Sequence, residues 1–131
     1  MAGRKAIYID GFKHSNPIPN AARIGNIVVS GALMGRDSRT NEIAEGIEAQ
    51  TALSFHHMRE LIEAAGGTTD DIVKVTVALR DHDNRAVLNA EWTRMFPDAA
   101  TRPARQTIPL VEDSPYLIHV DFMAVLGDGN G

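Results

Sequence analysis

Apolar residues recur at three- and four-residue spacing along the middle of the chain, which predicts two amphipathic helices. The first runs from about Gly46 and is closed by Gly66-Gly67, since glycine commonly follows the last helical turn. Its apolar positions are Ala52, Phe55, Met58 or Arg59, Ile62 and Ala65, widened by Leu53 and Leu61. The second follows the N-cap candidates at 81–84 and ends at Pro97. Its apolar face carries Val87 or Leu88, Trp92, Met95 and Phe96.

The rest of the chain alternates between apolar and polar positions in short runs, which is the pattern of strands. Strands are expected at 6–9, 22–24, 27–30, 72–79, 104–110 and 117–126. In the last of these, Ile118, Val120, Phe122 and Ala124 share one face, and Leu117, His119, Asp121 and Met123 share the other. Turn-forming residues predict loops at 15–20, 31–40 and 112–115, and a disordered tail at 127–131.

The resulting order of elements is β, β, β, α, β, α, β, β, within a single domain over residues 1–131. This order predicts an α+β fold, in which a mixed β-sheet carries two helices on one face. The opposite face of the sheet then has nothing to cover it. A bare apolar face on so small a chain favours self-association.

Composition narrows the function classes. The 131 residues contain no cysteine, which excludes disulfides, thiolate catalysis and cysteine-based metal sites. The formal net charge of -4 does not provide the basic surface that nucleic acid binding requires. No apolar run reaches the roughly 20 residues of a membrane span, and the N-terminus lacks a signal-peptide pattern. We therefore expect a cytoplasmic protein with no nucleic acid or membrane partner.

Arg105 is the first candidate for chemistry, because it lies inside a predicted strand. Its planar fork of donors suits a carboxylate. The alternative is a surface arginine or an inter-strand ion pair, and spacing alone leaves both open.

Histidines supply further candidates. His119 and Asp121 share one strand face. A histidine near a carboxylate can act as a general acid or base. The alternative is that both side chains belong to a polar row that faces solvent. His56 and His57 are adjacent on a helix and point about 100° apart, so we interpret them as a solvated or interface pair rather than metal ligands. No metal and no cofactor are expected.

Ser30-Gly31 follows a predicted strand and resembles a nucleophile with a neighbouring backbone donor. The surrounding sequence has no G-x-S-x-G pattern, so a backbone donor at Gly31 is favoured over a serine nucleophile.

Taken together, these segments resemble the Rid family of reactive intermediate deaminases, also called the YjgF family. The similarity runs from about Ile24 to Val125 and rests on the order and spacing of several segments. They are 24–31 (IGNIVVSG), 47–51 (IEAQT), 63–77 (EAAGGTTDDIVKVTV), 88–92 (LNAEW), 96–97 (FP) and 102–107 (RPARQT).

The resemblance implies a chorismate-mutase-like fold and a homotrimer with a cleft at each subunit boundary. It also implies hydrolysis of small imine or enamine acids, such as 2-aminoacrylate, to keto acids and ammonia. The family's arginine corresponds to Arg105, its serine-glycine turn to Ser30 and Gly31, its helix asparagine to Asn89, and its cleft position after the arginine to Thr107.

Two positions depart from the family pattern. Ile18 stands where the family has a tyrosine, and His119 and Asp121 stand where deaminating members have two glutamates. His119 then takes the place of the glutamate that holds the attacking water. Alternatives are a specialised deaminase of a catabolic pathway (aminomuconate- or aminoacrylate-type), a non-enzymatic carboxylate-binding trimer and, least favoured, an endoribonuclease or translation inhibitor.

Overall fold

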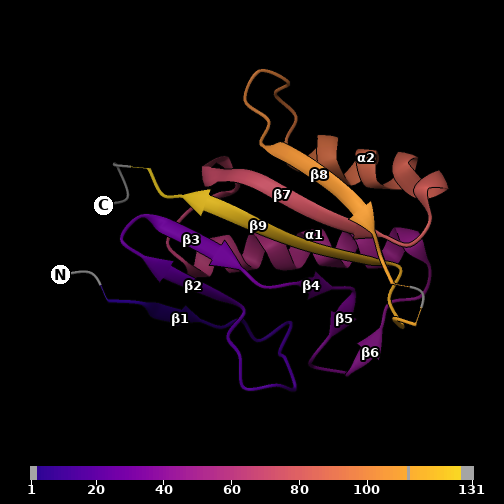
Figure 1. Cartoon of the computed structure of the whole chain (residues 1–131), viewed down its shortest axis with the longest axis horizontal. Helices are drawn as coiled ribbons and strands as arrows, with labels where there is room; N and C mark the ends of the chain where they lie inside the picture. The colour runs from indigo at the N-terminus through magenta and orange to yellow at the C-terminus, as the bar shows by residue number, and fades with distance from the viewer. Residues whose placement is uncertain (1–2, 112, 128–131) are drawn as a thin grey trace.

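The computed structural model describes residues 3–111 and 113–127 (Figure 1). Two α-helices are formed, α1 (Ile47–Ala64) and α2 (Arg85–Met95), with short 3-10 turns at Thr69–Asp71 and His82–Asn84. The strands are β1 (Lys5–Ile7), β2 (Ala21–Ile24), β3 (Ile27–Ser30), β4 (Leu33–Met34), β5 (Arg36–Asp37), β6 (Glu42–Ile43), β7 (Ile72–Leu79), β8 (Ala104–Pro109) and β9 (Ile118–Val125).

The main sheet has the strand order β1-β2-β3-β9-β7-β8, with β4 also paired to β9. Strands β7 and β8 run parallel, because α2 makes the crossover between them, and the other pairs are antiparallel. Strands β5 and β6 form a separate two-stranded sheet. The prediction of a mixed sheet is confirmed.

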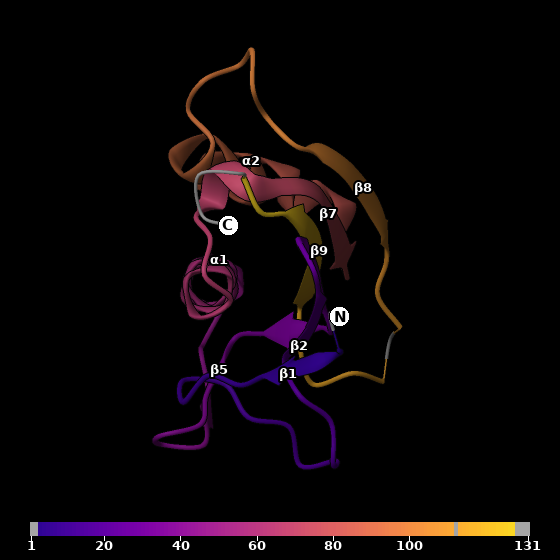
Figure 2. The same cartoon turned by 90° about the vertical axis from the view of Figure 1, so that its left-hand side faces the viewer.

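Both helices cover the same face of the sheet, as predicted (Figure 2). The core lies between the helices and the sheet and contains the inward-facing residues of β7 and β9. Ile118, Val120, Phe122 and Ala124 are all buried, so the two faces of β9 are as the alternation predicts.

The first helix matches its prediction apart from one position. Gly66, with φ of 96°, follows its last turn as expected. Ala52, however, is exposed, and the buried stripe includes the polar residues Thr51 and Ser54 instead. Small polar side chains can pack closely against the sheet. A search for apolar residues at helical spacing does not detect them.

The second helix also matches its prediction. Leu88 and Trp92 are buried within it, and Phe96 follows as its C-cap before Pro97. Asp81 caps the preceding 3-10 turn by accepting a hydrogen bond from the Asp83 N–H.

The N-terminal third differs most from expectation. The first strand is Lys5–Ile7 rather than 6–9, because the Ile9 N–H donates to the Asn20 side chain instead of a neighbouring strand. Residues 31–40, predicted as loop, contain β4 and β5. These two-residue strands are too short to produce an alternation. Of the predicted turn at 112–115 and tail at 127–131, residues 112 and 128–131 lie outside the described residues.

The face of the sheet opposite the helices carries exposed apolar side chains. Ile27 pairs with Val125 and Val29 with Met123 across β3 and β9, and all four are exposed. These four residues form an apolar stripe that neither helix covers. Within the described part of the chain, no helix has both the length and the apolar character that crossing a membrane requires.

Candidate functional site

Arg105 projects from the edge strand β8 toward the helix side of the sheet. Its register partner on β7 is Val75, which is buried against the helices, and neighbouring strands place partnered side chains on the same face. The guanidinium carbon lies 5.0 Å from the centre of the Trp92 ring on α2. The guanidinium therefore packs against the indole in a cation–π contact.

The edge of this guanidinium is incompletely satisfied. Its Nη1 atom is buried and has no hydrogen-bond partner among the described residues. No carboxylate in that part of the chain forms an ion pair with it. Burial, with a smaller contribution from the charge of Arg85, lowers the pKa of Arg105, yet an arginine remains protonated at neutral pH. A buried, charged, unpaired donor is costly, and a bound carboxylate would relieve that cost.

Two other predicted site residues lie near Arg105. Thr107 is two residues along β8 and shares its face, opposite Val77. Asn89 is exposed on α2, three residues before Trp92, with its carbonyl engaged by the Thr93 hydroxyl. Strand β8 and helix α2 therefore carry these three predicted site residues on the same side of the sheet.

His119 lies on the opposite face of the sheet from Arg105. Its register partners are Ala78 on β7 and Met34 on β4, and its ring meets that of Tyr116 edge to face at 5.7 Å. Its Nε2 atom is buried and has no partner among the described residues. Within one chain, Arg105 and His119 cannot reach the same small molecule.

The charge state of His119 follows from its surroundings. Burial and then the charge of Arg80 lower the pKa of His119, which favours the neutral ring at pH 7. Burial raises the pKa of Asp121, with the charge of Lys74 opposing it.

The Ser30-Gly31 turn is held by internal hydrogen bonds. Ser30 Oγ accepts a hydrogen bond from the Phe122 N–H at 2.8 Å, which gives the hydroxyl a structural role. The Gly31 N–H donates to the Asn20 carbonyl at 2.9 Å, so the backbone donor predicted here already has an acceptor. Ile18 is exposed in the preceding loop and lines a shallow pocket with His14 and Asn16.

The predicted site residues therefore fall into two groups. Three strand spacings separate Ser30 on β3 from Arg105 on β8, or roughly 14 Å at about 4.8 Å each. Arg105, Thr107 and Asn89 lie at one edge of the chain, whereas Ile18, Gly31 and His119 lie toward β3 and β4. A site that uses both groups needs residues from two copies of the chain.

The interpretation of His56 and His57 was wrong for one of the pair. His56 is exposed and lies 3.1 Å from Glu60, as expected of a solvated residue. His57 is fully buried, and its Nε2 lies 2.9 Å from the Arg36 carbonyl. A search for apolar residues at helical spacing does not detect such a residue, because it classes histidine as polar. No cluster of three or more potential metal-ligating side chains occurs within 3–111 and 113–127.

Two features near these groups were not found from the sequence. Trp92 was assigned to the core alone, although its ring also supports Arg105. Arg36, which was placed in a loop, contacts the buried ring of Phe12, as does His14. Only the tertiary structure brings Arg105 to Trp92 and Arg36 to Phe12, and their separations along the chain give no periodic signal.

Comparison with known proteins adds to this geometry. The family model described as Endoribonuclease L-PSP, which represents the Rid/YjgF proteins, matches residues 12–125. The chain belongs to this family. It is 32% identical over 93 residues to a 2-iminobutanoate/2-iminopropanoate deaminase of Salmonella typhimurium, covering 70% of this chain and 73% of that protein. It is 35% identical over 82 residues to a RutC family protein of Haemophilus influenzae, covering 63% of each.

Solved structures of the family agree with the fold. The RidA protein of an Antarctic Psychrobacter has a TM-score of 0.84 and 26% identity, over 93% of this chain and 99% of that one. A Rid family protein from Yersinia pestis has a TM-score of 0.87 at 21% identity, which supports the fold alone.

Proposed function

We propose that this protein hydrolyses small 2-imino or 2-enamino acids to 2-keto acids and ammonia. One observation carries the proposal: Arg105 has a buried Nη1 without a hydrogen-bond partner, held against Trp92. A carboxylate would accept two parallel hydrogen bonds from this fork. Similarity to proteins named as 2-iminobutanoate/2-iminopropanoate deaminases supports the choice of an imine acid.

The reaction needs little more than positioning. Water adds to the carbon of the C=N bond, the nitrogen takes up a proton, and the carbinolamine collapses to the keto acid and ammonia. Arg105 fixes the carboxylate, Thr107 and Asn89 shape the pocket beside it, and a neutral His119 accepts a hydrogen bond from the attacking water. The cytoplasmic location stays a prediction.

Because Arg105 and His119 lie on opposite faces, we propose that each site forms between two copies of the chain. The apolar stripe of Ile27, Val29, Met123 and Val125 supports this arrangement, since burying it removes a continuous apolar surface from water. A closed ring of three copies gives three equivalent sites.

Arg105→Ala tests the function. Calorimetric titration with pyruvate, the 2-keto acid product of 2-aminoacrylate hydrolysis, should show about a ten- to hundredfold loss of affinity, the usual cost of losing charge-assisted hydrogen bonds. Ammonia release from enzymatically generated 2-aminoacrylate should fall with it. Arg105→Lys should remain impaired, because an ammonium lacks the planar fork.

The matched control is Arg94→Ala, which removes an equal charge from an exposed residue of α2 that pairs with Glu91. It should bind pyruvate as the parent does. Equal affinity in the parent and both Arg105 variants would overturn the proposal. A parent protein that binds pyruvate through Arg105 but releases ammonia no faster than the spontaneous reaction would instead support a carboxylate-binding protein that is not a deaminase.

A further inference from the structure

A pocket of about 550 Å³ lies apart from Arg105, between the loop before Ile18, strand β5 and Tyr116. Its polar lining consists of Lys13, His14, Ser15, Asn16, Arg36, Ser38, Asn41 and Tyr116. Of the described residues, no aspartate or glutamate lines it. The lining therefore combines basic groups and neutral donors without a carboxylate to balance them.

Arg36 is the fixed positive charge of this pocket. Its Nε donates to the Tyr116 hydroxyl at 3.1 Å, and its Nη1 to Ser38 Oγ at 3.2 Å and Asn41 Oδ1 at 3.4 Å. Its Nη2 donates to the Lys13 carbonyl. All of these acceptors are neutral. Within 3–111 and 113–127, no carboxylate forms an ion pair with Arg36, so its geometry is fixed but its charge is not compensated.

His14 supplies an independent observation. Its Nε2 atom is buried and has no hydrogen-bond partner among the described residues. The ring packs edge to face on Phe12 with 5.2 Å between centroids, and the Arg36 guanidinium lies over the same Phe12 ring at 4.8 Å. Phe12 is fully buried, so it forms a rigid floor that holds both groups at one pocket.

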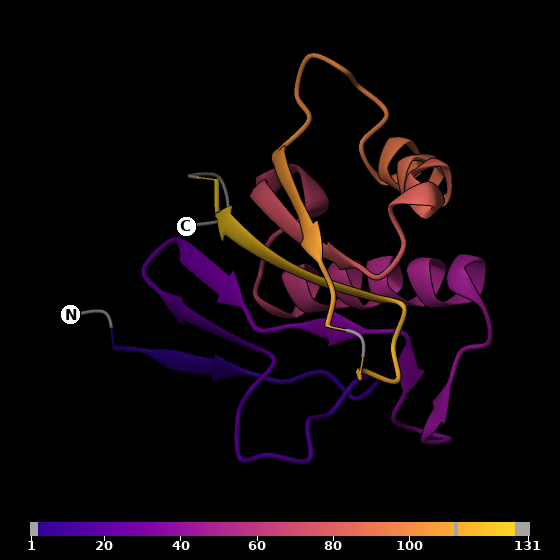
Figure 3. The same cartoon turned by 45° about the vertical axis from the view of Figure 1, so that its right-hand side comes forward.

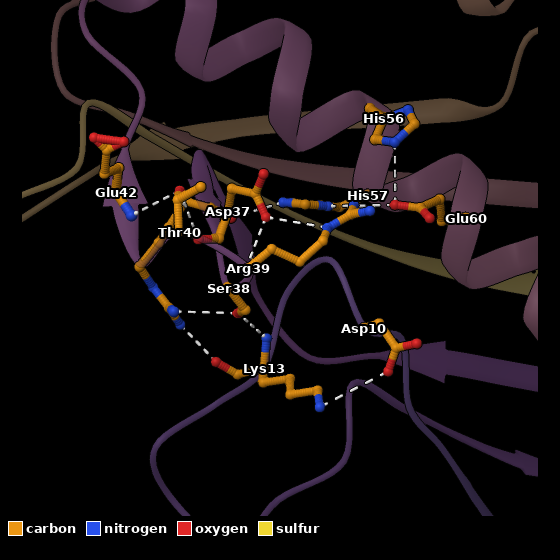
Figure 4. A network of polar contacts seen from close by, with 11 residues as sticks. Asp10, Lys13, Asp37, Ser38, Arg39, Thr40, Glu42, His56, His57 and Glu60 are labelled. Atoms are coloured by element: carbon orange, nitrogen blue, oxygen red, sulfur yellow. Dashed lines mark hydrogen bonds and ion pairs between the residues drawn. The ribbon is translucent and has the colours of Figure 1, made fainter.

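The neighbouring charges are otherwise paired away from this pocket. Lys13 extends toward Asp10, and Arg39 pairs with Asp37 while His56 pairs with Glu60 (Figure 4). The Lys13–Asp10 pair is exposed and contributes little, so Lys13 stays available to a ligand.

We infer that this pocket is a second anion site, which binds a small oxyanion such as a carboxylate or phosphate between His14 and Arg36. The anion accepts a hydrogen bond from the unpartnered Nε2 of His14 and balances the charge of Arg36. The site does not involve Arg105, but it adjoins the other group of predicted site residues, because His14 lines a pocket with Ile18 and its Nε2 faces Gly31. It neighbours His119 through Tyr116, whose ring meets that of His119 and whose hydroxyl accepts from Arg36.

The anion should also favour protonated His14. Burial and the charge of Arg36 lower the pKa of His14 in the free protein, and a bound anion opposes both. The titratable or charged groups around His14 in its two pockets are Tyr8, Asp10, Lys13, Arg36 and Tyr116.

NMR titration with inorganic phosphate, and separately with acetate, at constant ionic strength tests the inference. Saturable shifts confined to the amides of Lys13, His14, Ser38 and Asn41 are expected, with a raised pKa for His14, and they should persist in Arg105→Ala. Phosphate tighter than acetate identifies a phosphate site, and the reverse a carboxylate site. Shifts that grow linearly with concentration or spread over the surface overturn the proposal.

Variants make the test specific. His14→Gln should weaken binding about tenfold, as expected for a lost hydrogen bond to a charged group. Arg36→Gln should abolish saturation if it folds. Arg39→Gln is the matched control, because Arg39 carries the same charge as Arg36 in the turn that follows β5, but pairs with Asp37 and lines a different pocket. Equal weakening by Arg39→Gln and His14→Gln would reduce the effect to general electrostatics and overturn the assigned site.

Discussion

Two arginines of this chain rest on aromatic rings at nearly equal distances, Arg36 on Phe12 at 4.8 Å and Arg105 on Trp92 at 5.0 Å. Their edges differ. Arg36 donates hydrogen bonds to Tyr116, Ser38, Asn41 and Lys13, and so ties together segments far apart in the chain. Arg105 keeps a buried nitrogen without a partner.

The comparison separates an arginine whose donors are satisfied within the fold from one that keeps a buried donor without a partner. The aromatic platform is common to both and is therefore not the mark of a binding site. What distinguishes them is whether neighbouring acceptors satisfy the donors. Arg36 supplies only its charge to the pocket beside it, whereas Arg105 offers charge and donors together.

The largest expected difference is in stability. Arg36→Ala should lower the free energy of unfolding by about 2–3 kcal/mol, because several hydrogen bonds to a charged group are lost at once. Arg105→Ala should change it by less than about 1 kcal/mol, since the lost cation–π contact is partly offset by removing an unpartnered buried donor. Urea unfolding of both variants at equal protein concentration measures this. Comparable losses would erase the distinction between the two arginines.

The aromatic rings under the two arginines, Trp92 and Phe12, should also differ in how their substitution affects binding. Trp92→Phe weakens the support under Arg105 and should reduce pyruvate affinity by about two- to fivefold, in line with about 0.5–1 kcal/mol for a cation–π contact. Phe12→Leu removes the ring under Arg36 and should lower stability while leaving pyruvate affinity unchanged. Calorimetric titration of the two variants decides it. Pyruvate binding that is insensitive to Trp92→Phe would mean that the indole does not position Arg105.

A smaller effect concerns pH and the region around Arg36. Burial lowers the pKa of His57, partly opposed by its hydrogen bond to the Arg36 carbonyl and by the charge of Glu60. The unfolded chain then takes up a proton before the native one, so stability is complete above about pH 6.5 and falls as the pH drops below it. His57→Gln should reduce that slope in chemical unfolding measured between about pH 7 and 5. An unchanged slope would assign the acid sensitivity to His14 or His119, whose pKa values are also lowered by burial.

Much of the fold follows from the sequence because its long elements carry strong periodic signals. The stripe at Phe55, Met58 and Ile62 identifies α1, and the alternation from Ile118 to Ala124 assigns both faces of β9. The short strands β4, β5 and β6 could not be found this way, since two residues define no period. Figure 3 shows them together with the N-terminal loops on the side of the molecule away from α2.

The candidate site was harder to predict for a different reason. Sequence pattern placed Arg105 and His119 on strands, and this is correct for both. The pattern alone could not show whether the two side chains lie on the same face of the sheet. The face on which Arg105 lies depends on the parallel register of β8 with β7. Only that register shows that the two side chains point away from each other.

The most direct test of a shared site between copies is complementation between two inactive variants. Arg105→Ala and His119→Ala chains are prepared separately, and each is first checked by sedimentation for three times the 14.2 kDa chain mass. They are then mixed in equal amounts, unfolded and refolded together, and assayed for ammonia release from 2-aminoacrylate. Random assembly gives about one site in four with both native residues when they come from different chains. The account predicts recovery of about a quarter of the parent activity. Two variants that refold and mix but recover no activity above their separate rates would contradict it.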